Sequence, residues 1–285
     1  MSTKANVERA LLYIEQNLSS RITLEDIADA ANYSQWYFHR LFRVLTGYCV
    51  NDYLRKRRLS EASHALLYTS KPIRQIASEY QFESQEAFTR SFSSVTQLSP
   101  GRFRKQIAPL LKFPALSLDN SYKHLRTGVK HMKPQFTKKA AFNVIGVFCR
   151  ANPSESLHKL WNDFGARVQE IPNVSDPHKA YQVCVMKDSD PEAEIFTFIA
   201  GMEVSEISQV PDGMMAHSVP DAHYAVFEHH GLLDTLHKTY EYIYAVWLPE
   251  SGYEMADTDS LEVYDERFKV GSPDSVYEIW VPLKK

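Results

Sequence analysis

The sequence holds few of the residues that mark redox, metal or phosphate-binding sites. Its 285 residues include three cysteines, Cys49, Cys149 and Cys184, with no C-x-x-C pair and no metal-finger spacing. Ten glycines leave few positions for phosphate-cradling loops, and neither a G-x-S-x-G motif nor a dinucleotide fingerprint occurs. We therefore expect no catalytic residues, no cofactor and no bound metal.

Long apolar runs are also missing. No stretch approaches the roughly 20 apolar residues that cross a bilayer, and the N-terminus has no apolar signal region. We expect a cytoplasmic protein with free thiols and no membrane contact. Because 44% of the residues are hydrophobic, the chain has enough apolar material for two ordinary domains.

Charge is distributed unevenly along the chain. Residues 1–110 carry 15 basic and 10 acidic residues, and residues 136–285 carry 12 basic and 24 acidic ones. A basic half concentrates a polyanion such as DNA, whereas an acidic half repels it. The two halves therefore require different partners.

The N-terminal half repeats one helix-turn-helix pattern. Ile27-Ala28, Phe38-x-Arg40-x-Phe42 and Thr46 recur 49 to 50 positions later as Ile76-Ala77, Phe88-x-Arg90-x-Phe92 and Thr96. Each unit would place one helix in a major groove, so a single chain could read two segments of duplex DNA, and a monomer is sufficient. Thr23, Ser34 and Ser84 precede the expected helices as N-caps.

The residues that face away from the apolar side of the second helix in each unit are the candidates for DNA contact. Arg can bind guanine with two hydrogen bonds, Gln can pair with adenine, and an aromatic ring can press on thymine methyl groups. Alternatively, Trp36 could pack in the core and Arg40 could touch only phosphate. The predicted DNA-binding residues are Gln35, Trp36, His39, Arg40, Gln85, Thr89 and Arg90.

A long helix is expected between the two units, with the cationic run Arg55-Lys56-Arg57-Arg58 near its start. Such a run is commonly a solvated face, and here it could also line the DNA backbone. The helix would hold the two reading helices about 34 Å apart, one turn of the duplex.

Residues 7–105 resemble the DNA-binding domain of AraC/XylS-type bacterial transcription regulators, particularly the Rob, MarA and SoxS branch. The resemblance rests on S-Q-W-Y-F-H-R-L-F at 34–42, P-I-R-Q-I-A at 72–77, F-x-S-Q-x-x-F-T-R-S-F at 82–92 and S-P-G-R-F-R-K at 99–105. It implies a module of seven helices in which Trp36 and Arg40 read bases and Arg90 chiefly contacts phosphate. His39, Glu86 and Ala87 depart from the family pattern.

The C-terminal half alternates strand-like and helical patterns. Strand patterns at 142–148, 181–185 and 195–200 surround a helical pattern at about 155–170, and strand patterns at 224–227, 261–264 and 276–281 surround another at about 233–248. Strand, helix, strand, strand therefore occurs twice. We predict a multidomain protein: an all-α double helix-turn-helix domain at 1–106, a linker at 107–135, and an α+β duplicated domain at 136–285.

This half resembles the GyrI-like effector-binding domain. The motifs are A-G-M-E-V at 200–204, V-P-D-G at 210–213, Y-A-V-F-E-H-H-G at 224–231, L-x-x-T-Y-x-Y-I-Y-A-V-W-L-P at 236–249, L-E-V-Y at 261–264 and I-W-V-P at 279–282. The resemblance implies two pseudo-symmetric halves around an aromatic cleft that binds hydrophobic, frequently cationic compounds. Glu262 matches the glutamate at its base.

Alternation along the strand at 261–264 places Glu262 and Tyr264 on one face. A buried carboxylate is costly unless it is paired, and a ligand cation could supply the partner. Equally, Glu262 could be a surface acid paired with Arg267, and each aromatic could be plain core. The predicted ligand-binding residues are Glu262, Tyr264, Trp161, Tyr181, Phe198, Tyr224, Phe227 and Trp280.

We therefore predict a ligand-responsive, sequence-specific transcription regulator, an activator, that binds promoter DNA and a small-molecule effector, with RNA polymerase as a further candidate partner. The alternative is a drug-hydrolysing or drug-sequestering protein in which Glu262 and a tyrosine activate water. His217, His223, His229 and His230 lack the helical spacing of a zinc site.

Overall fold

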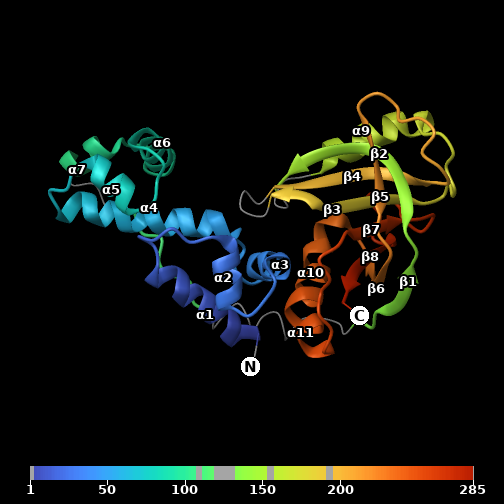
Figure 1. Cartoon of the computed structure of the whole chain (residues 1–285), viewed down its shortest axis with the longest axis horizontal. Helices are drawn as coiled ribbons and strands as arrows, with labels where there is room; N and C mark the ends of the chain where they lie inside the picture. The colour runs from blue at the N-terminus through green and yellow to red at the C-terminus, as the bar shows by residue number, and fades with distance from the viewer. Residues whose placement is uncertain (1–2, 107–110, 119–131, 153–156, 191–194, 285) are drawn as a thin grey trace. The chain divides into compact units, whose positions relative to one another are not determined.

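The computed structural model describes residues 3–106, 111–118, 132–152, 157–190 and 195–284. The chain forms two compact units, residues 1–124 and 125–285, and each is described by itself (Figure 1).

Unit 1 is helical, as the sequence predicts. Its helices are α1 (Thr3–Gln16), α2 (Leu24–Ala30), α3 (Gln35–Thr46), α4 (Val50–Tyr68), α5 (Ile73–Glu79), α6 (Gln85–Thr96) and α7 (Pro100–Gln106). The first helix, α1, buries Val7, Ala10, Leu11 and Ile14 on one face. The expected caps form, because Thr23, Ser34 and Ser84 each accept a backbone N–H from the first turn of the following helix.

The sequence repeat is also a repeat of backbone geometry. Asn32 and Gln81 occupy the left-handed region, with φ of 56° and 61°, in the turns that precede α3 and α6. The Thr46 hydroxyl donates to the Phe42 carbonyl at 2.7 Å, and the Thr96 hydroxyl donates to the Phe92 carbonyl at 2.8 Å. The two helix-turn-helix units therefore begin and end their second helices in the same way.

The central helix α4 joins both cores. Its start contacts α3, where the rings of Phe42 and Tyr53 lie 5.7 Å apart. Its second half packs against α6 in a separate cluster. That cluster contains Leu59, Ala62, Leu66, Phe88, Phe92 and Phe103. The helices α3 and α6 are thus attached to different parts of one continuous helix (Figure 1).

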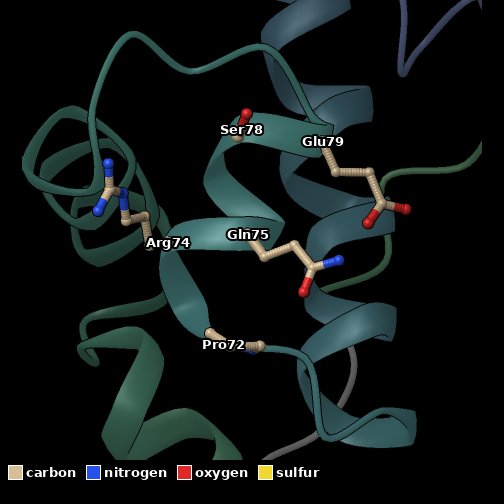
Figure 2. A pocket seen from close by; sticks show the side chains of 5 residues that line it. All are labelled: Pro72, Arg74, Gln75, Ser78 and Glu79. Carbon is tan, nitrogen blue, oxygen red and sulfur yellow. The ribbon is translucent and has the colours of Figure 1, made fainter.

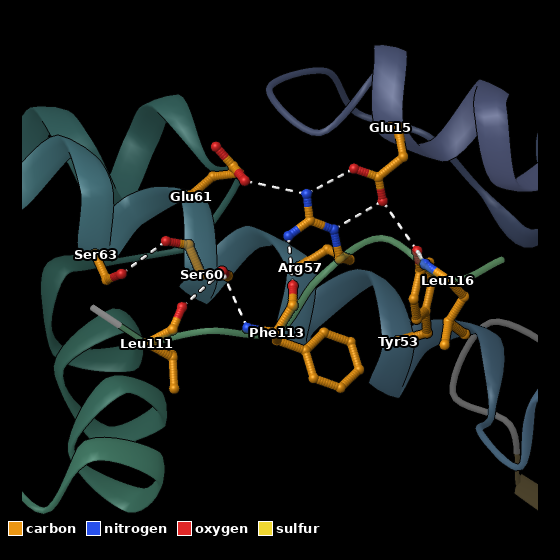
Figure 3. Close-up of polar contacts among 9 residues, drawn as sticks. All are labelled: Glu15, Tyr53, Arg57, Ser60, Glu61, Ser63, Leu111, Phe113 and Leu116. Carbon is orange, nitrogen blue, oxygen red and sulfur yellow. Dashed lines mark hydrogen bonds and ion pairs between the residues drawn. The ribbon is translucent and has the colours of Figure 1, made fainter. Parts of the chain in front are cut away.

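Residues 111–118 are not a free linker, although the sequence placed them in one. The Ser60 hydroxyl donates to the Leu111 carbonyl at 2.7 Å, and Arg57 Nη1 donates to the Phe113 carbonyl at 2.6 Å (Figure 3). The Tyr53 hydroxyl accepts from Leu116 N at 3.2 Å. This segment is therefore part of unit 1, and most of the remaining predicted linker lies outside the described residues.

Unit 2 consists of an antiparallel sheet with helices. The strands are β1 (Gln135–Lys139), β2 (Phe142–Ala151), β3 (Ala180–Asp190), β4 (Ile195–Val204), β5 (Met214–Val219), β6 (Ala222–His230), β7 (Ser260–Tyr264) and β8 (Val276–Leu283). The helical segments are α9 (His158–Arg167), η1 (Val168–Glu170), η2 (Leu233–Thr235), α10 (Leu236–Glu241), the π-helix η3 (Tyr242–Trp247) and α11 (Leu248–Ser251). The expected helix start near 155 lies outside the described residues.

The strand order shows the predicted duplication. The order across the sheet is β1-β6-β8-β7-β3-β4-β2-β5. The strands β1 to β4 of the first half correspond to β5 to β8 of the second half. If each strand is replaced by its counterpart, the same order is obtained when the sheet is read from the opposite edge. The equivalent strands β3 and β7 pair at the centre of the sheet. The first strand of each half pairs with a strand of the other half, since β1 pairs with β6 and β5 pairs with β2.

Two strands of the sheet were missed by the sequence reading. β1 has the sequence Gln-Phe-Thr-Lys-Lys and lies partly in the predicted linker, and β5 reads Met-Met-Ala-His-Ser-Val. Both are edge strands, which are commonly short and polar because one side faces water and must resist further pairing. The apolar alternation that revealed the central strands is weak there.

Candidate DNA interface and ligand site

The helix α3 presents a polar face opposite its buried residues. Trp36 and Arg40 are four residues apart and lie half-buried on that face. Arg43, three residues beyond Arg40, occupies the same face and was missed by the sequence reading. Because α-helical side chains at i, i+4 and i+7 align, these three form one stripe along α3. Gln35 is half-buried in the first turn.

His39 differs from its predicted role. We expected it on the outward face, but its side chain is buried, with 1% exposed. One residue corresponds to 100° on a helix, so His39 follows Phe38 at the border of the buried face rather than opposite it. The ring is therefore not displayed beside Trp36 and Arg40.

The second helix, α6, displays a different set of side chains. Gln85 and Arg90 are exposed, as is Glu86 in the first turn. Thr89 is half-buried and its hydroxyl donates to the Gln85 carbonyl at 2.7 Å, so that hydroxyl is engaged within its own helix. The pKa of Glu86 is lowered by its backbone and Ser84 hydrogen bonds, which keeps this carboxylate ionised.

The cationic run 55–58 does not act as one surface. Arg57 is 7% exposed and bonds Glu15, Glu61 and the Phe113 carbonyl (Figure 3). Arg58 donates to the carbonyls of Leu18 and Ser20. Both cations therefore hold unit 1 together. Arg55 and Lys56 instead pair with Asp52 in the first turn of α4.

A hollow of about 550 Å³ lies beside α5. Its lining residues are Pro72, Arg74, Gln75, Ser78 and Glu79 (Figure 2). The Glu79 carboxylate is 2.6 Å from the Lys71 ammonium, so its charge is already compensated. The hollow is a polar surface feature of the second helix-turn-helix unit and lies on a different unit from Glu262.

In unit 2, strand alternation divides the predicted ligand residues between the two faces of the sheet. Glu262 and Tyr264 share one face of the sheet. Ile279 of β8 pairs with Glu262 on one side and with Phe227 on the other, so Phe227 lies on this face too. In β3, Gln182 pairs with Glu262 and therefore lies on the same face. Cys184 lies two residues further along β3 and pairs with Phe198, which places Phe198 on this face as well. The helices cover this face, since Trp247 of η3 contacts the Phe227 ring at 4.9 Å.

Three predicted ligand residues lie on the other face. Tyr181, Tyr224 and Trp280 belong to the hydrophobic cluster of that face, in which Tyr224 is fully buried and Trp280 is partly buried. The rings of Tyr224 and Trp280 are 5.4 Å apart. Tyr181 immediately precedes Gln182, and Trp280 immediately follows Ile279, so the period of two in a strand turns both away from Glu262. The structure therefore does not bring these three residues together with Glu262, and their role in ligand binding stays a prediction.

Glu262 is 6% exposed and is held by two tyrosines from different elements. Tyr240 of α10 donates to Oε1 at 2.5 Å, and Tyr264 donates to Oε2. Burial, and then the charge and hydrogen bond of Glu262, raise the pKa of Tyr264 far above its ordinary value, so this hydroxyl stays protonated as a donor. Arg267 bonds Asp265, Glu228 and Glu278 instead, which removes the surface-pair interpretation of Glu262.

Trp161 of α9 completes the arrangement from the other half of the domain. Its ring lies 4.6 Å from that of Tyr264, and its Nε1 donates to Gln182 Oε1 at 2.9 Å. Sequence reasoning missed Gln182 and Tyr240. Gln182 could have been found from its position in β3, which is equivalent to that of Glu262 in β7. Tyr240 has no such signal, because Tyr242 and Tyr244 follow it closely in the adjoining π-helix.

Within the described residues, no helix combines the length and apolarity needed to cross a bilayer.

Comparison with known proteins identifies both units. Residues 132–284 match the model of the GyrI-like small molecule binding domain, which is more than half of the chain. The chain belongs to the GyrI-like family. Residues 27–106 match a helix-turn-helix domain model, of the AraC type that the sequence predicts. The chain therefore joins a helix-turn-helix domain to a GyrI-like small molecule binding domain.

Individual relatives match parts of the chain. It is 30% identical over 196 residues to the right origin-binding protein of Escherichia coli (strain K12), covering 65% of each protein. It is 32% identical over 157 residues to the transcriptional regulator BrlR of Pseudomonas aeruginosa, covering 54% of this chain and 57% of BrlR. The HTH-type transcriptional activator AarP of Providencia stuartii is 37% identical over 98 residues, 34% of this chain and 73% of AarP. For the first two relatives, the chain thus spans less than two thirds of their length.

Among solved structures, SAV2435 bound to tetraphenylphosphonium is similar with a TM-score of 0.43 and 15% identity, over 54% of this chain and 94% of that one.

Proposed function

We propose that this chain is a transcription activator that binds promoter DNA through α3 and α6 and responds to an aromatic cation bound at Glu262. The observation that carries the ligand class is the buried carboxylate of Glu262, held by two tyrosine hydroxyls on the helix-covered face of unit 2. The protein acts as a monomer, since one chain contains two reading helices, and RNA polymerase is the partner that activation requires.

The chemistry of the ligand follows from burial. An ionised carboxylate loses hydration when it is buried, and hydrogen bonds from neutral hydroxyl groups bring no compensating charge. A cationic ligand adds charge compensation, and the partly exposed ring of Trp161, which packs beside Tyr264, attracts the same charge. A neutral ligand of similar shape gains only from apolar contact.

The DNA contacts follow from the stripe on α3 and the exposed end of α6. Trp36 and Arg40 contact base edges in one major-groove segment, with Gln35 beside them. Gln85 and Arg90 contact the next segment, where Arg90 binds phosphate and the acidic Glu86 weakens the hold of α6. The relatives AarP and BrlR, described as an activator and a regulator of transcription, support this assignment.

The proposal is tested by thermal unfolding of the full chain with benzyltriphenylphosphonium or with neutral triphenylphosphine oxide. A ligand that binds only the native state raises the melting temperature by mass action. We expect a rise with the cation, little with the neutral compound, and loss of the cation effect in Glu262→Gln. Equal shifts for both compounds, or an unchanged effect in the variant, would refute the assignment of Glu262.

The enzymatic alternative is tested in the same samples. Tyr264 hydrogen-bonds to Glu262, an arrangement that could orient a base. Mass spectrometry after prolonged incubation with hydrolysable electrophilic aromatic compounds should show no product. Turnover that disappears in Glu262→Gln would establish a hydrolase instead.

A further inference from the structure

Gln182 and Glu262 occupy equivalent positions in the duplicated domain. They are direct partners in the pairing of β3 with β7, and on either side of them Tyr181 pairs with Val263 and Val183 pairs with Leu261. This register places the pair on the pseudo-two-fold axis that relates the halves. Their side chains point to the same face, and directly opposite Cβ atoms in an antiparallel pair lie about 4.5–5.5 Å apart.

Each of the two side chains is held by an aromatic residue from the helix of its own half. Trp161 of α9 donates to Gln182, and Tyr240 of α10 donates to Glu262. Gln182 is 8% exposed and Glu262 is 6% exposed, so both are built into the same buried layer. The domain therefore contains the same polar position twice, once as a carboxylate and once as a neutral amide.

The tryptophan fixes the orientation of that amide. The indole Nε1 can only donate, so the atom that faces it must be the Gln182 oxygen. The amino group Nε2 therefore points away from Trp161, and within the described parts of the chain it donates no hydrogen bond. The amide thus displays two N–H donors next to a carboxylate.

A second polar group on this face also lacks a partner within the described residues. Tyr277 is fully buried and its hydroxyl makes no hydrogen bond there. Its ring stacks on that of Tyr264 at 4.9 Å. The negative charge of Glu262 contributes, after burial, to raising the pKa of Tyr277, so the orphaned hydroxyl lies within electrostatic range of the site. Buried orphaned donors are rare, so the Tyr277 hydroxyl adds a second donor to this layer that no described residue satisfies.

We propose that Gln182 sets the selectivity of the effector site, so that it takes aromatic monocations that carry a hydrogen-bond acceptor and disfavours dications. This inference rests on the proposed function of Glu262. The carboxylate receives the positive centre, and Gln182 Nε2 donates to a carbonyl or ether oxygen a few ångströms away. A second cation would meet the positive end of the amide and leave those donors unsatisfied, which costs affinity.

The decisive variant is Gln182→Glu, because it changes one heavy atom. A carboxylate can still accept from Trp161 Nε1, and its second oxygen replaces the amino group with an acceptor. Two carboxylates opposite one another repel, and a dication relieves that repulsion. The ligands are benzyltriphenylphosphonium and its dicationic counterpart p-xylylenebis(triphenylphosphonium), titrated calorimetrically into the full chain at pH 8.

We expect wild type to bind the monocation more tightly and Gln182→Glu to shift the dication-to-monocation affinity ratio at least tenfold toward the dication. The matched control is Gln169→Glu, which adds the same charge at an exposed position of η1 in the same unit. A ratio that stays within twofold of wild type, or that moves equally in the control, overturns the role of Gln182. Loss of all cation binding in wild type overturns both this inference and the proposed function.

The donor role is tested separately with Gln182→Met, which removes the amide and keeps the length of the side chain. Wild type should bind (acetylbenzyl)triphenylphosphonium several-fold more tightly than the benzyl compound, and the variant should bind both alike. A preference that survives in the variant excludes donation by Gln182. The unchanged affinity expected for the benzyl compound shows that the variant is folded.

Discussion

Arg57 of α4 and Glu15 of α1 form a two-bond ion pair, with Nε 2.8 Å from Oε1 and Nη2 2.7 Å from Oε2 (Figure 3). The same guanidinium also donates to the Phe113 carbonyl, so one side chain joins the first helix, the central helix and segment 111–118.

Replacing Arg57 by Leu should destabilise the protein strongly. Removal of one partner from a buried pair leaves an uncompensated charge and commonly costs about 3–5 kcal/mol. The control is Arg55→Leu. The Arg55 side chain is 58% exposed, so the loss of its ion pair with Asp52 should change the free energy of unfolding little. Urea unfolding followed by circular dichroism measures the difference, and similar losses in both variants would contradict the structural role of Arg57.

Arg40 and Arg90 should respond differently when each is changed to Ala. Loss of a base contact by Arg40 should cost about 1–3 kcal/mol on the preferred site and relax its preference at one base pair. Loss of a phosphate contact by Arg90 should weaken all sequences alike and reduce the salt dependence. Binding to specific and scrambled duplexes at several salt concentrations separates the two. Sequence-independent losses in both variants would show that α3 does not read bases.

Gly146 and Gly201 should resist substitution because the paired strands β2 and β4 approach each other closely there. The two residues are register partners, and a Cβ on Gly146 would lie 2.1 Å from the Ala200 carbonyl oxygen. Gly146→Ala should therefore lower the melting temperature substantially. Gly165→Ala is the control, since nothing lies within 4 Å of its Cβ and alanine favours a helix by roughly 0.5–1 kcal/mol. A harmless Gly146→Ala would disprove the close approach.

Acid should destabilise unit 2 through His229, which is 2% exposed. Its Nε2 faces the Leu232 carbonyl and must donate, so its Nδ1 accepts from the Thr239 hydroxyl. Burial lowers the pKa of His229 below 6.5. The unfolded chain therefore takes up a proton that the folded protein does not, and stability that is full above pH 6.5 is lost as the pH falls toward the folded-state pKa. Melting temperatures between pH 8 and 5 should fall more in wild type than in His229→Gln. Parallel curves would exclude this group.

Local patterns predicted most of the helices, caps and central strands. Thr23, Ser34 and Ser84 precede their helices because a side-chain oxygen before an apolar periodic segment satisfies free backbone N–H groups, which is a property of a few adjacent residues. The repeat of Ile27-Ala28 at Ile76-Ala77 likewise predicted two helix-turn-helix units. The edge strands β1 and β5 were not predicted, because their apolar alternation is weak and each pairs with a strand of the opposite half of the domain.

The candidate sites divide in the same way. Glu262 and Tyr264 were placed together correctly because two residues of one strand are separated by the period of the strand. The faces of Tyr181, Tyr224 and Trp280 were left open by the sequence, because they depend on the register between strands far apart in the chain. His39 was misplaced because a residue at the border of a helix face is buried or exposed according to what packs beside it.

The amino-acid sequence alone determined the two-unit organisation, the charge contrast between the halves, and the helices that carry Arg40 and Arg90. These follow from composition and short-range periodicity, which act along the backbone. Only the tertiary structure decided that Gln182 stands opposite Glu262, that segment 111–118 is fastened to α4, and that Arg57 is internal. Each of these depends on contacts between residues far apart in the chain, which no local pattern encodes.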